Sequence, residues 1–457
     1  MKMNKLMTGA FALTVAASST FPALADGETP PPPPTVSGVT MTQANDRKVT
    51  IEYTLADGPA VITLDVQTNA TPNAAADDPG WTSIGGEAIW NAAGDVWKKV
   101  EGDTTHTITW RPDQSWPGHK VTGNGARAVV TAWATNNTPD YMVVDLEINN
   151  EYRFYPAEDF LPKASFKQEG AAITNNPSFK TDKLVMRKIT AAGIEWKMGS
   201  ASDETGRSTD GSETLHSVTL ADNYYIGIFE VTQKQWEYVT GEMASSRASF
   251  TYQGDMRPMD NVSFSVIRGG NDNTAAPTSS SFLGKLRTKS GIPFDFPSDA
   301  QWEYAARAGH EHGCWGDGSV INITGSGNSA TDSNLNKLGR YKVNRPGGTG
   351  GATNTPNSGK GESCAPSLAG TAIVGSYNPN SWGIYDMHGN VMEWCLDSWQ
   401  TDISGNSTGA VVPGTSHYRY GGGWDSSAPQ SRPAYRANNA NTYNTVGLRL
   451  ACPVGIK

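Results

Sequence analysis

The stretch of sequence that decides the fold reads Trp382-Gly383-Ile384-Tyr385-Asp386-Met387-His388-Gly389-Asn390-Val391-Met392-Glu393-Trp394. Long segments rich in Gly, Asn and Ser precede it, at residues 316–336 and 345–367. So much irregular chain in one domain is unusual unless the loops bind a ligand or are fixed by metals or disulfides. The stretch therefore belongs to a loop-rich domain, and the motifs around it show how far that domain extends.

Two short helices are expected upstream of this stretch. Residues 232–235 read Thr-Gln-Lys-Gln, a capping-box pattern, and Gly241 ends the first helix. The pattern recurs at residues 298–301, and Gly309 ends the second helix. The tryptophan that follows each capping box is most simply a core residue.

In chain order, the motifs of this region resemble those of the formylglycine-generating enzymes, also called sulfatase-modifying factors. The matching segments are residues 193–200, 225–227, 229–232, 260–263, 302–309, 382–394, 421–424 and 447–450. This many motifs in family order indicate the fold. The resemblance implies an α+β, C-type-lectin-related topology, with little regular structure and with loops held around a small sheet.

The N-terminal end of the sequence predicts export. Residues 1–25 are typical of a signal peptide, with Lys2 and Lys5 at the start, an apolar run at 6–17 and the small-x-small cleavage site at 23–25. The apolar run is too short to cross a bilayer as a helix. We therefore expect a periplasmic or secreted protein without a membrane span, and a Pro-rich spacer follows at 26–35.

An all-β sandwich domain is predicted at residues 36–150, followed by a connector at 151–180 and the sulfatase-modifying-factor-like domain at 181–453. Apolar residues alternate with polar ones from Val49 to Leu55, as expected of a half-buried strand. Further short strands are predicted at 107–110, 127–133 and 142–148. The spacing favours an immunoglobulin-like sandwich. It carries no catalytic constellation, so we interpret it as a spacer or adhesion module.

Composition limits the partners and the redox chemistry. The net charge is −9 and no long basic run is present, which argues against nucleic acid as the main partner. Four cysteines in an oxidising compartment allow up to two disulfides. Three connectivities are possible, and the favoured one pairs Cys314 with Cys364 and Cys395 with Cys452.

The resemblance leaves activity open, because one fold hosts many functions. Working members of the family oxidise a target cysteine of a sulfatase to formylglycine, using two of their own cysteines, five residues apart, to hold copper. Thiolates suit Cu(I), and thiol exchange can capture a substrate cysteine. The matching positions here are Ser426 and Ser431. The resemblance therefore implies no catalytic residue at these positions and makes copper an unlikely cofactor.

Other chemistries are less favoured by the sequence. A serine nucleophile at 426 or 431 would need a positioned base, for which His388 and His417 are the nearest candidates in sequence. Residues 310–314 read His-Glu-His-Gly-Cys, but this spacing matches no standard zinc site. We interpret this segment as a solvated loop.

The resemblance also implies a structural calcium ion. In the family, the loop of the Gly-Asn-Val-x-Glu-Trp motif holds Ca²⁺, and oxygen donors of this kind suit that ion. The matching ligands would be the side chains of Asn390 and Glu393 and the carbonyl of Val391, with Asn334 resembling a residue of a second site. The alternative is that Asn390 shapes a turn and Glu393 is a buried hydrogen-bond acceptor.

The last loops are expected to form a binding groove. The segment at 435–444 combines adaptable Asn amides with tyrosines, as binding surfaces do, and it resembles the hypervariable segment of retroelement-diversified receptors. The residues expected to line the groove are Trp424, Asp425, Ser426, Ser431, Arg432, Tyr435, Arg436, Asn438, Asn439, Asn441, Tyr443 and Asn444. The sequence thus favours a non-catalytic module that binds protein, peptide or glycan. The alternative is a formylglycine-generating oxidoreductase.

Overall fold

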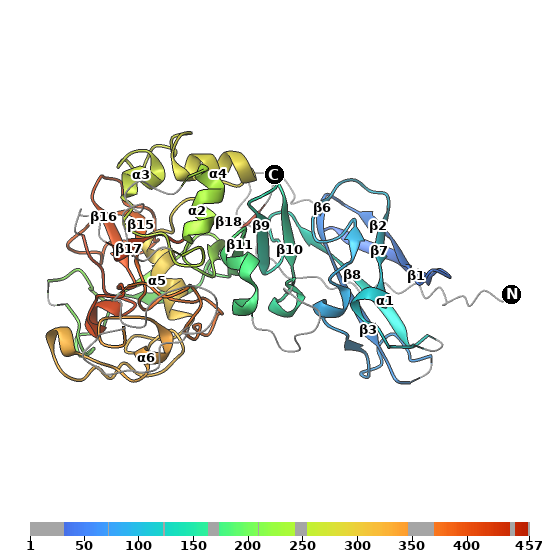
Figure 1. Ribbon diagram of the computed structural model, residues 1–457, viewed down its shortest axis with the longest axis horizontal. Helices are drawn as coiled ribbons and strands as arrows, with labels where there is room; N and C mark the ends of the chain where they lie inside the picture. The colour runs from blue at the N-terminus through green and yellow to red at the C-terminus, as the bar shows by residue number, and fades with distance from the viewer. Residues whose placement is uncertain are drawn as a thin grey trace. The chain divides into compact units, whose positions relative to one another are not determined.

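A computed structural model describes residues 32–71, 73–121, 124–162, 173–208, 210–242, 254–345, 370–438 and 444–455. Within these residues the chain forms two compact units (Figure 1). The first unit takes the described residues within Met1–Met142, Tyr152–Asn176 and Val454–Lys457, and the second takes those within Val143–Glu151 and Pro177–Pro453. Of the predicted connector at 151–180, most of the described residues belong to the first unit.

The predicted signal peptide and residues 26–31 of the Pro-rich spacer lie outside the described residues. Among the helices that the structure does describe, none has the length and apolar character needed to cross a membrane.

The first unit is built from two antiparallel sheets. One sheet has the order β1 (Thr35–Gln43), β2 (Val49–Ala56), β7 (Thr105–Trp110), β5 (Ala93–Gly94). The other has the order β4 (Thr82–Ser83), β3 (Ala60–Thr68), β6 (Lys99–Val100), and β8 (Ala126–Ala134) pairs with β3. In β2 the residues at 49, 51, 53 and 55 are all buried, which confirms the predicted alternation. The connections hold α1 (Pro112–Ser115), η1 (Gly86–Ile89), η2 (Glu158–Phe160) and η3 (Ile173–Asn175).

The second unit has short sheets surrounded by loops. In one sheet, the neighbouring strands are β11 (Lys183–Ile189), β14 (Tyr224–Gly227) and β18 (Ala451–Pro453), in that order. A second sheet has the order β16 (His417–Tyr420), β15 (Met392–Ser398), β17 (Val446–Gly447). A two-stranded ribbon consists of β12 (Glu195–Met198) and β13 (His216–Thr219). Its helices are α2 (Gln233–Thr240), α3 (Phe264–Arg268), α4 (Phe282–Ser290), α5 (Asp299–Arg307), α6 (Leu335–Leu338), η4 (Pro177–Lys180), η5 (Gly327–Ser329) and η6 (Ala428–Ser431). Strands β9 (Tyr141–Asp145) and β10 (Tyr152–Tyr155) lie at the sequence boundary of the two units. The mixed α+β character agrees with the prediction.

Both predicted capping boxes are present. Thr232 caps α2 and Ser298 caps α5, and in each case the glutamine three residues later bonds back to the capping residue. The end of α2 at Gly241 is also as predicted. In contrast, the cap of α5 comes one residue before the predicted Gly309, because Ala308 itself adopts the left-handed conformation and its N–H bonds to the Tyr304 carbonyl.

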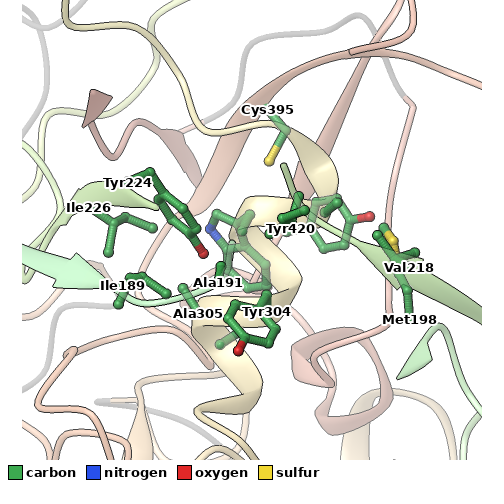
Figure 2. Packing of buried hydrophobic residues seen from close by; sticks show 14 of the residues in the cluster. Ile189, Ala191, Met198, Val218, Tyr224, Ile226, Tyr304, Ala305, Cys395 and Tyr420 are labelled. Carbon is green, nitrogen blue, oxygen red and sulfur yellow. The ribbon is translucent and has the colours of Figure 1, made fainter. Parts of the chain in front are cut away.

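Helix α5 supplies the centre of the core. Trp302, Tyr304 and Ala305 pack against residues of β11 and β14, and against Tyr420 of β16 (Figure 2). The Trp302 ring stacks on the Tyr420 ring at a centroid distance of 4.9 Å. The indole of Trp302 is fully buried, which confirms the core position expected from its place behind the capping box.

The predicted Cys395–Cys452 disulfide is wrong. Both residues are buried free thiols, on strands β15 and β18 of different sheets, and burial raises the pKa of both. Sequence spacing could not show that the two strands belong to separate sheets. Cys314 is also a free thiol, and its predicted partner Cys364 lies outside the described residues.

Replacing the capping residue of α5 should destabilise the second unit. Ser298→Ala removes the hydroxyl that accepts from the Gln301 N–H, and we expect a loss of about 1 kcal/mol, the usual cost of a lost cap. Urea unfolding of the variant measures this loss. Ser326→Ala is the matched control, since Ser326 precedes η5 without a side-chain cap bond. Equal stabilities of the two variants would contradict the role of the cap.

Candidate functional site

The candidate site is a tight turn that follows β16. The chain passes through Gly421 and Gly422, whose φ values of 88° and 69° favour glycine, and then enters η6. A Cβ on Gly422 would lie 2.7 Å from the Ser431 Oγ atom, so the close approach of the two segments also requires glycine. The turn therefore brings positions 426 and 431 onto one local scaffold.

Ser426 and Ser431, the two serines that the resemblance matched to the family's cysteine positions, have different surroundings. Ser426 is half-buried, and its Oγ atom accepts a hydrogen bond from the Gly423 N–H at 2.9 Å. Ser431 is fully buried, and within the described residues its Oγ atom has no hydrogen-bond partner. A buried hydroxyl cannot attack an external substrate, so Ser431 is not positioned as a nucleophile.

His388 lies next to this turn but does not serve it as a base. Its Nε2 atom accepts from the Gly316 N–H at 3.1 Å, so the proton is on Nδ1, which donates to the Ser431 carbonyl at 3.1 Å. Burial lowers the pKa of His388 to about 4. The neutral ring thus fixes two backbone segments and has no nitrogen left for a serine hydroxyl.

His417 is also held by the backbone. Its ring nitrogens face the carbonyl oxygens of Leu396 at 3.1 Å and Asn271 at 2.8 Å, and its ring stacks on Phe264. Within the described residues, the hydrogen bonds of both candidate bases therefore go to the backbone and not to a serine hydroxyl.

Arg432 was expected in the binding groove, but it is an internal ion-pair residue. Its guanidinium is fully buried and donates to Glu204 at 2.7 Å and to Glu213 at 2.8 Å. Both carboxylates are more than two hundred positions away in sequence. A buried charge needs such partners, and reading the segment alone could not reveal them.

Arg436 is likewise buried, contrary to the prediction. Its guanidinium lies 3.7 Å from Asp299 and 3.8 Å from Glu303, and over the rings of Tyr418 and Tyr420. It belongs to the core beneath α5. An outside ligand could reach it only if the core opened.

The exposed part of the predicted groove centres on Asp425. This carboxylate pairs with Arg345 and, at 3.4 Å, with Lys342. The Arg345 guanidinium lies over the ring of Trp424, whose indole N–H donates to the Asn444 carbonyl at 2.8 Å. The sequence analysis missed Lys342 and Arg345, because no local pattern links them to a residue eighty positions later.

The structure describes only some of the other predicted groove residues. Tyr435 is half-buried, and its hydroxyl accepts from the Gln430 amide at 3.2 Å. Asn438 is exposed. Asn439, Asn441 and Tyr443 lie outside the described residues. The described exposed surface near Ser426 is therefore polar and charged, with one largely buried tryptophan beneath it.

The predicted calcium donors already have protein partners. Both oxygens of Glu393 accept from Arg449, at 2.7–3.1 Å, and one also accepts from the Trp302 indole at 2.6 Å. The Asn390 side chain accepts from the Ala372 N–H and donates to Glu230, which also accepts from the Val391 N–H. The carboxylate charge is thus compensated by a guanidinium, and this arrangement does not fit a cation at Glu393.

Asn334, the residue at the second predicted calcium position, also has a protein partner. The Asn334 amide donates to the Val320 carbonyl at 3.2 Å. Across the described residues there is no group of three or more His, Cys, Asp or Glu side chains that could hold a metal ion, and this includes the predicted loop at 310–314. Calcium stays a prediction, and the geometry favours the alternative in which Glu393 is a buried acceptor.

Comparison with known proteins places this arrangement in a family. Residues 175–454, more than half of the chain, match the family model described as the sulfatase-modifying factor enzyme 1-like domain. The chain belongs to this family. The match confirms the predicted resemblance, and its limits differ by only a few residues from the predicted 181–453.

Curated relatives of this sulfatase-modifying-factor-like chain carry different names. Chaperone protein LppX of Paenibacillus barcinonensis is 28% identical over 254 residues, which cover 50% of this chain and 79% of that protein. The formylglycine-generating enzyme of Streptomyces coelicolor is 31% identical over 169 residues, covering 34% and 45%. That of Thermomonospora curvata is 32% identical over 108 residues, covering 23% and 28%. The chain thus spans less than half of either enzyme.

Solved structures with a similar arrangement include PvdO from Pseudomonas aeruginosa, with a TM-score of 0.44 and 23% identity over 59% of this chain and 94% of that chain. Treponema denticola variable protein 1 has a TM-score of 0.42 and 23% identity over 59% and 95%.

The neutral state of His388 leads to a pH prediction. Its folded pKa of about 4 lies below the unfolded value of about 6.5. The stability that it contributes is therefore complete above pH 6.5 and is lost as the pH falls toward 4, by up to about 3 kcal/mol. Nitrogen-15 NMR of the imidazole and urea unfolding at pH 7 and 4.5 check this. His388→Gln should flatten the pH dependence, and titration of His388 near pH 6.5 would contradict the prediction.

The Glu393–Arg449 pair leads to a second prediction. Glu393→Gln leaves the buried guanidinium without its counter-ion, so we expect a loss of about 3–5 kcal/mol, equal in calcium and in EGTA. Asp425→Asn, which breaks exposed pairs, is the control and should cost less than about 1 kcal/mol. Thermal unfolding with and without calcium measures both. A loss seen only with calcium present would restore the metal-ligand role of Glu393.

Proposed function

We propose that this protein is an exported binding protein, whose sulfatase-modifying-factor-like domain holds a partner polypeptide without oxidising it. The observation that carries the proposal is the pair of serines, Ser426 and Ser431, at the positions of the family's copper-binding cysteines. Export rests on the predicted signal peptide at 1–25.

The chemistry of the turn does not fit copper. A serine hydroxyl is a hard, weakly acidic oxygen, whereas Cu(I) prefers thiolate or thioether ligands. The Ser431 hydroxyl is also enclosed within the fold. The described thiols offer no substitute, because burial raises the pKa of Cys314, Cys395 and Cys452 and so disfavours the reactive thiolate. No oxidation step can be written through these residues.

The exposed surface beside the turn supports binding instead. Asp425, Lys342 and Arg345 place both signs of charge side by side, with the Trp424 ring under the guanidinium. Charged and amide groups of this kind can pair with the backbone and side chains of a polypeptide. The similarity to a protein named as a chaperone, over 79% of its length, favours a polypeptide over a glycan.

The opposing candidate is a formylglycine-generating oxidoreductase, which the similarity to two such enzymes favours. The test is the conversion of a sulfatase-type peptide that carries its target cysteine, by Cu(I)-loaded protein under oxygen. Mass spectrometry detects aldehyde formation. We expect no conversion by the wild type, and conversion at a rate above the copper-only blank would overturn the proposal.

The double variant Ser426→Cys/Ser431→Cys tests whether the turn still has the geometry of an enzyme. Ser431→Cys should fold, because it replaces a buried hydroxyl that lacks a partner with a less polar thiol. We expect tight Cu(I) binding by the double variant alone, since two thiolates are needed. The single variants are matched controls, each with one added thiol. Equal copper affinity of the wild type would show that another ligand set is present.

A further inference from the structure

The first unit contains a cavity of about 660 Å³. Its lining residues come mainly from the end of β1, the start of β8 and the segment at 112–121 that contains α1. Figure 1 labels these three elements. Among the described strands, β1 pairs only with β2 and β8 only with β3, so no backbone hydrogen bonds join the two sheets at these edges. The volume is within the range of sites that bind small ligands.

The floor of the cavity is apolar. Val49, Val66 and Trp110 line it, and each is at most 5% exposed. The indole N–H of Trp110 is already used, since it donates to the Ala88 carbonyl at 2.9 Å and to the Ser115 hydroxyl at 2.8 Å. The floor therefore offers apolar contact and no free donor to a ligand.

Aromatic residues at the rim do not present an open stacking platform. The Trp116 ring is stacked on the His119 ring, with centroids 4.2 Å apart and planes 7° from parallel. One face of the indole is thus covered by the imidazole. The Trp116 ring is also stacked against the Trp110 ring, at a centroid distance of 6.5 Å. Its ring is therefore engaged within the protein, and the apolar floor is left as the main contact for a ligand.

The rim carries surplus positive charge. Arg47 and Lys120 line the cavity and are exposed. The lining carboxylate of Asp113 is paired with Arg111, which donates to both of its oxygens, at 3.0 and 2.9 Å, and which also lies 3.5 Å from the exposed carboxylate of Asp46. Arg47 and Lys120 thus exceed by one charge the carboxylates that Arg111 leaves uncompensated. A protein with a net charge of −9 therefore has a local cationic rim above an apolar floor.

We infer that this cavity binds an anionic amphiphile, whose acidic head lies at Arg47 and Lys120 and whose unbranched apolar tail packs against Val49, Val66 and Trp110. The carboxylate of a fatty acid is the simplest such head. The inference concerns the first unit alone and does not depend on the function proposed for the second.

Isothermal titration calorimetry on the whole mature protein tests the inference with decanoate as the probe. Acetate has the head without the tail, and decyltrimethylammonium has the tail with the opposite charge. We expect decanoate to bind and the other two to bind at least tenfold more weakly. Shortening the tail to octanoate should weaken binding by about tenfold, because two buried methylenes are lost.

Variants separate the head from the tail. Arg47→Gln/Lys120→Gln should weaken decanoate binding by about tenfold or more and reduce its salt dependence. Lys98→Gln/Lys337→Gln is the matched control, since it removes the same charge from exposed residues that do not line the cavity. Ala126→Trp fills the cavity from β8 and should abolish binding while keeping both rim charges.

Circular dichroism shows whether each variant is folded. If Ala126→Trp does not fold, the comparison of the rim variant with its control still tests the inference. The inference is overturned if decanoate does not bind, if decyltrimethylammonium binds equally well, or if the rim variant binds decanoate as tightly as its control.

Discussion

The second unit depends on one buried ion pair, between Glu393 of β15 and Arg449 just before β18. Both side chains are fully buried. Arg449 also donates to the carbonyls of Gly227 and Tyr385, and Glu393 accepts from the indole of Trp302 in α5. Four separate family segments therefore meet at a single guanidinium–carboxylate contact. A buried charge without these partners would be costly, so the loops that supply them are held in place by the same contact.

Further buried charged side chains hold other loops of the second unit in place. Arg432 joins the loop that follows η6 to Glu204 and Glu213 in the segment between β12 and β13. Glu230 accepts from the side chain of Asn390 and from the backbone N–H of Val391, at the centre of the stretch at 382–394. Polar groups with complete hydrogen bonding specify one arrangement, because every alternative leaves a buried donor or acceptor unpaired. This explains how a domain with so little regular structure has a defined core.

The chain has the fold of its family, but serines stand at the two positions that the resemblance matched to copper-binding cysteines. The glycine turn that follows β16 places Gly422 close to Ser431, and the neighbouring Gly423 N–H donates to the Ser426 hydroxyl. The oxygen atoms at those positions cannot hold Cu(I) as sulfur does. Under the function proposed above, the fold serves binding, and the charges of Asp425, Lys342 and Arg345 are the groups that contact the partner.

The sequence by itself determined the family, the capping boxes of α2 and α5, and the strand alternation of β2, because these features depend on residues that are close together in the chain. Tertiary structure alone decided that Arg432 and Arg436 are internal, that Cys395 and Cys452 are apart, and that Lys342 and Arg345 border Asp425. Each of these outcomes depends on a partner that lies far away in sequence. The burial of a charge is set by such partners, and local composition carries no information about them.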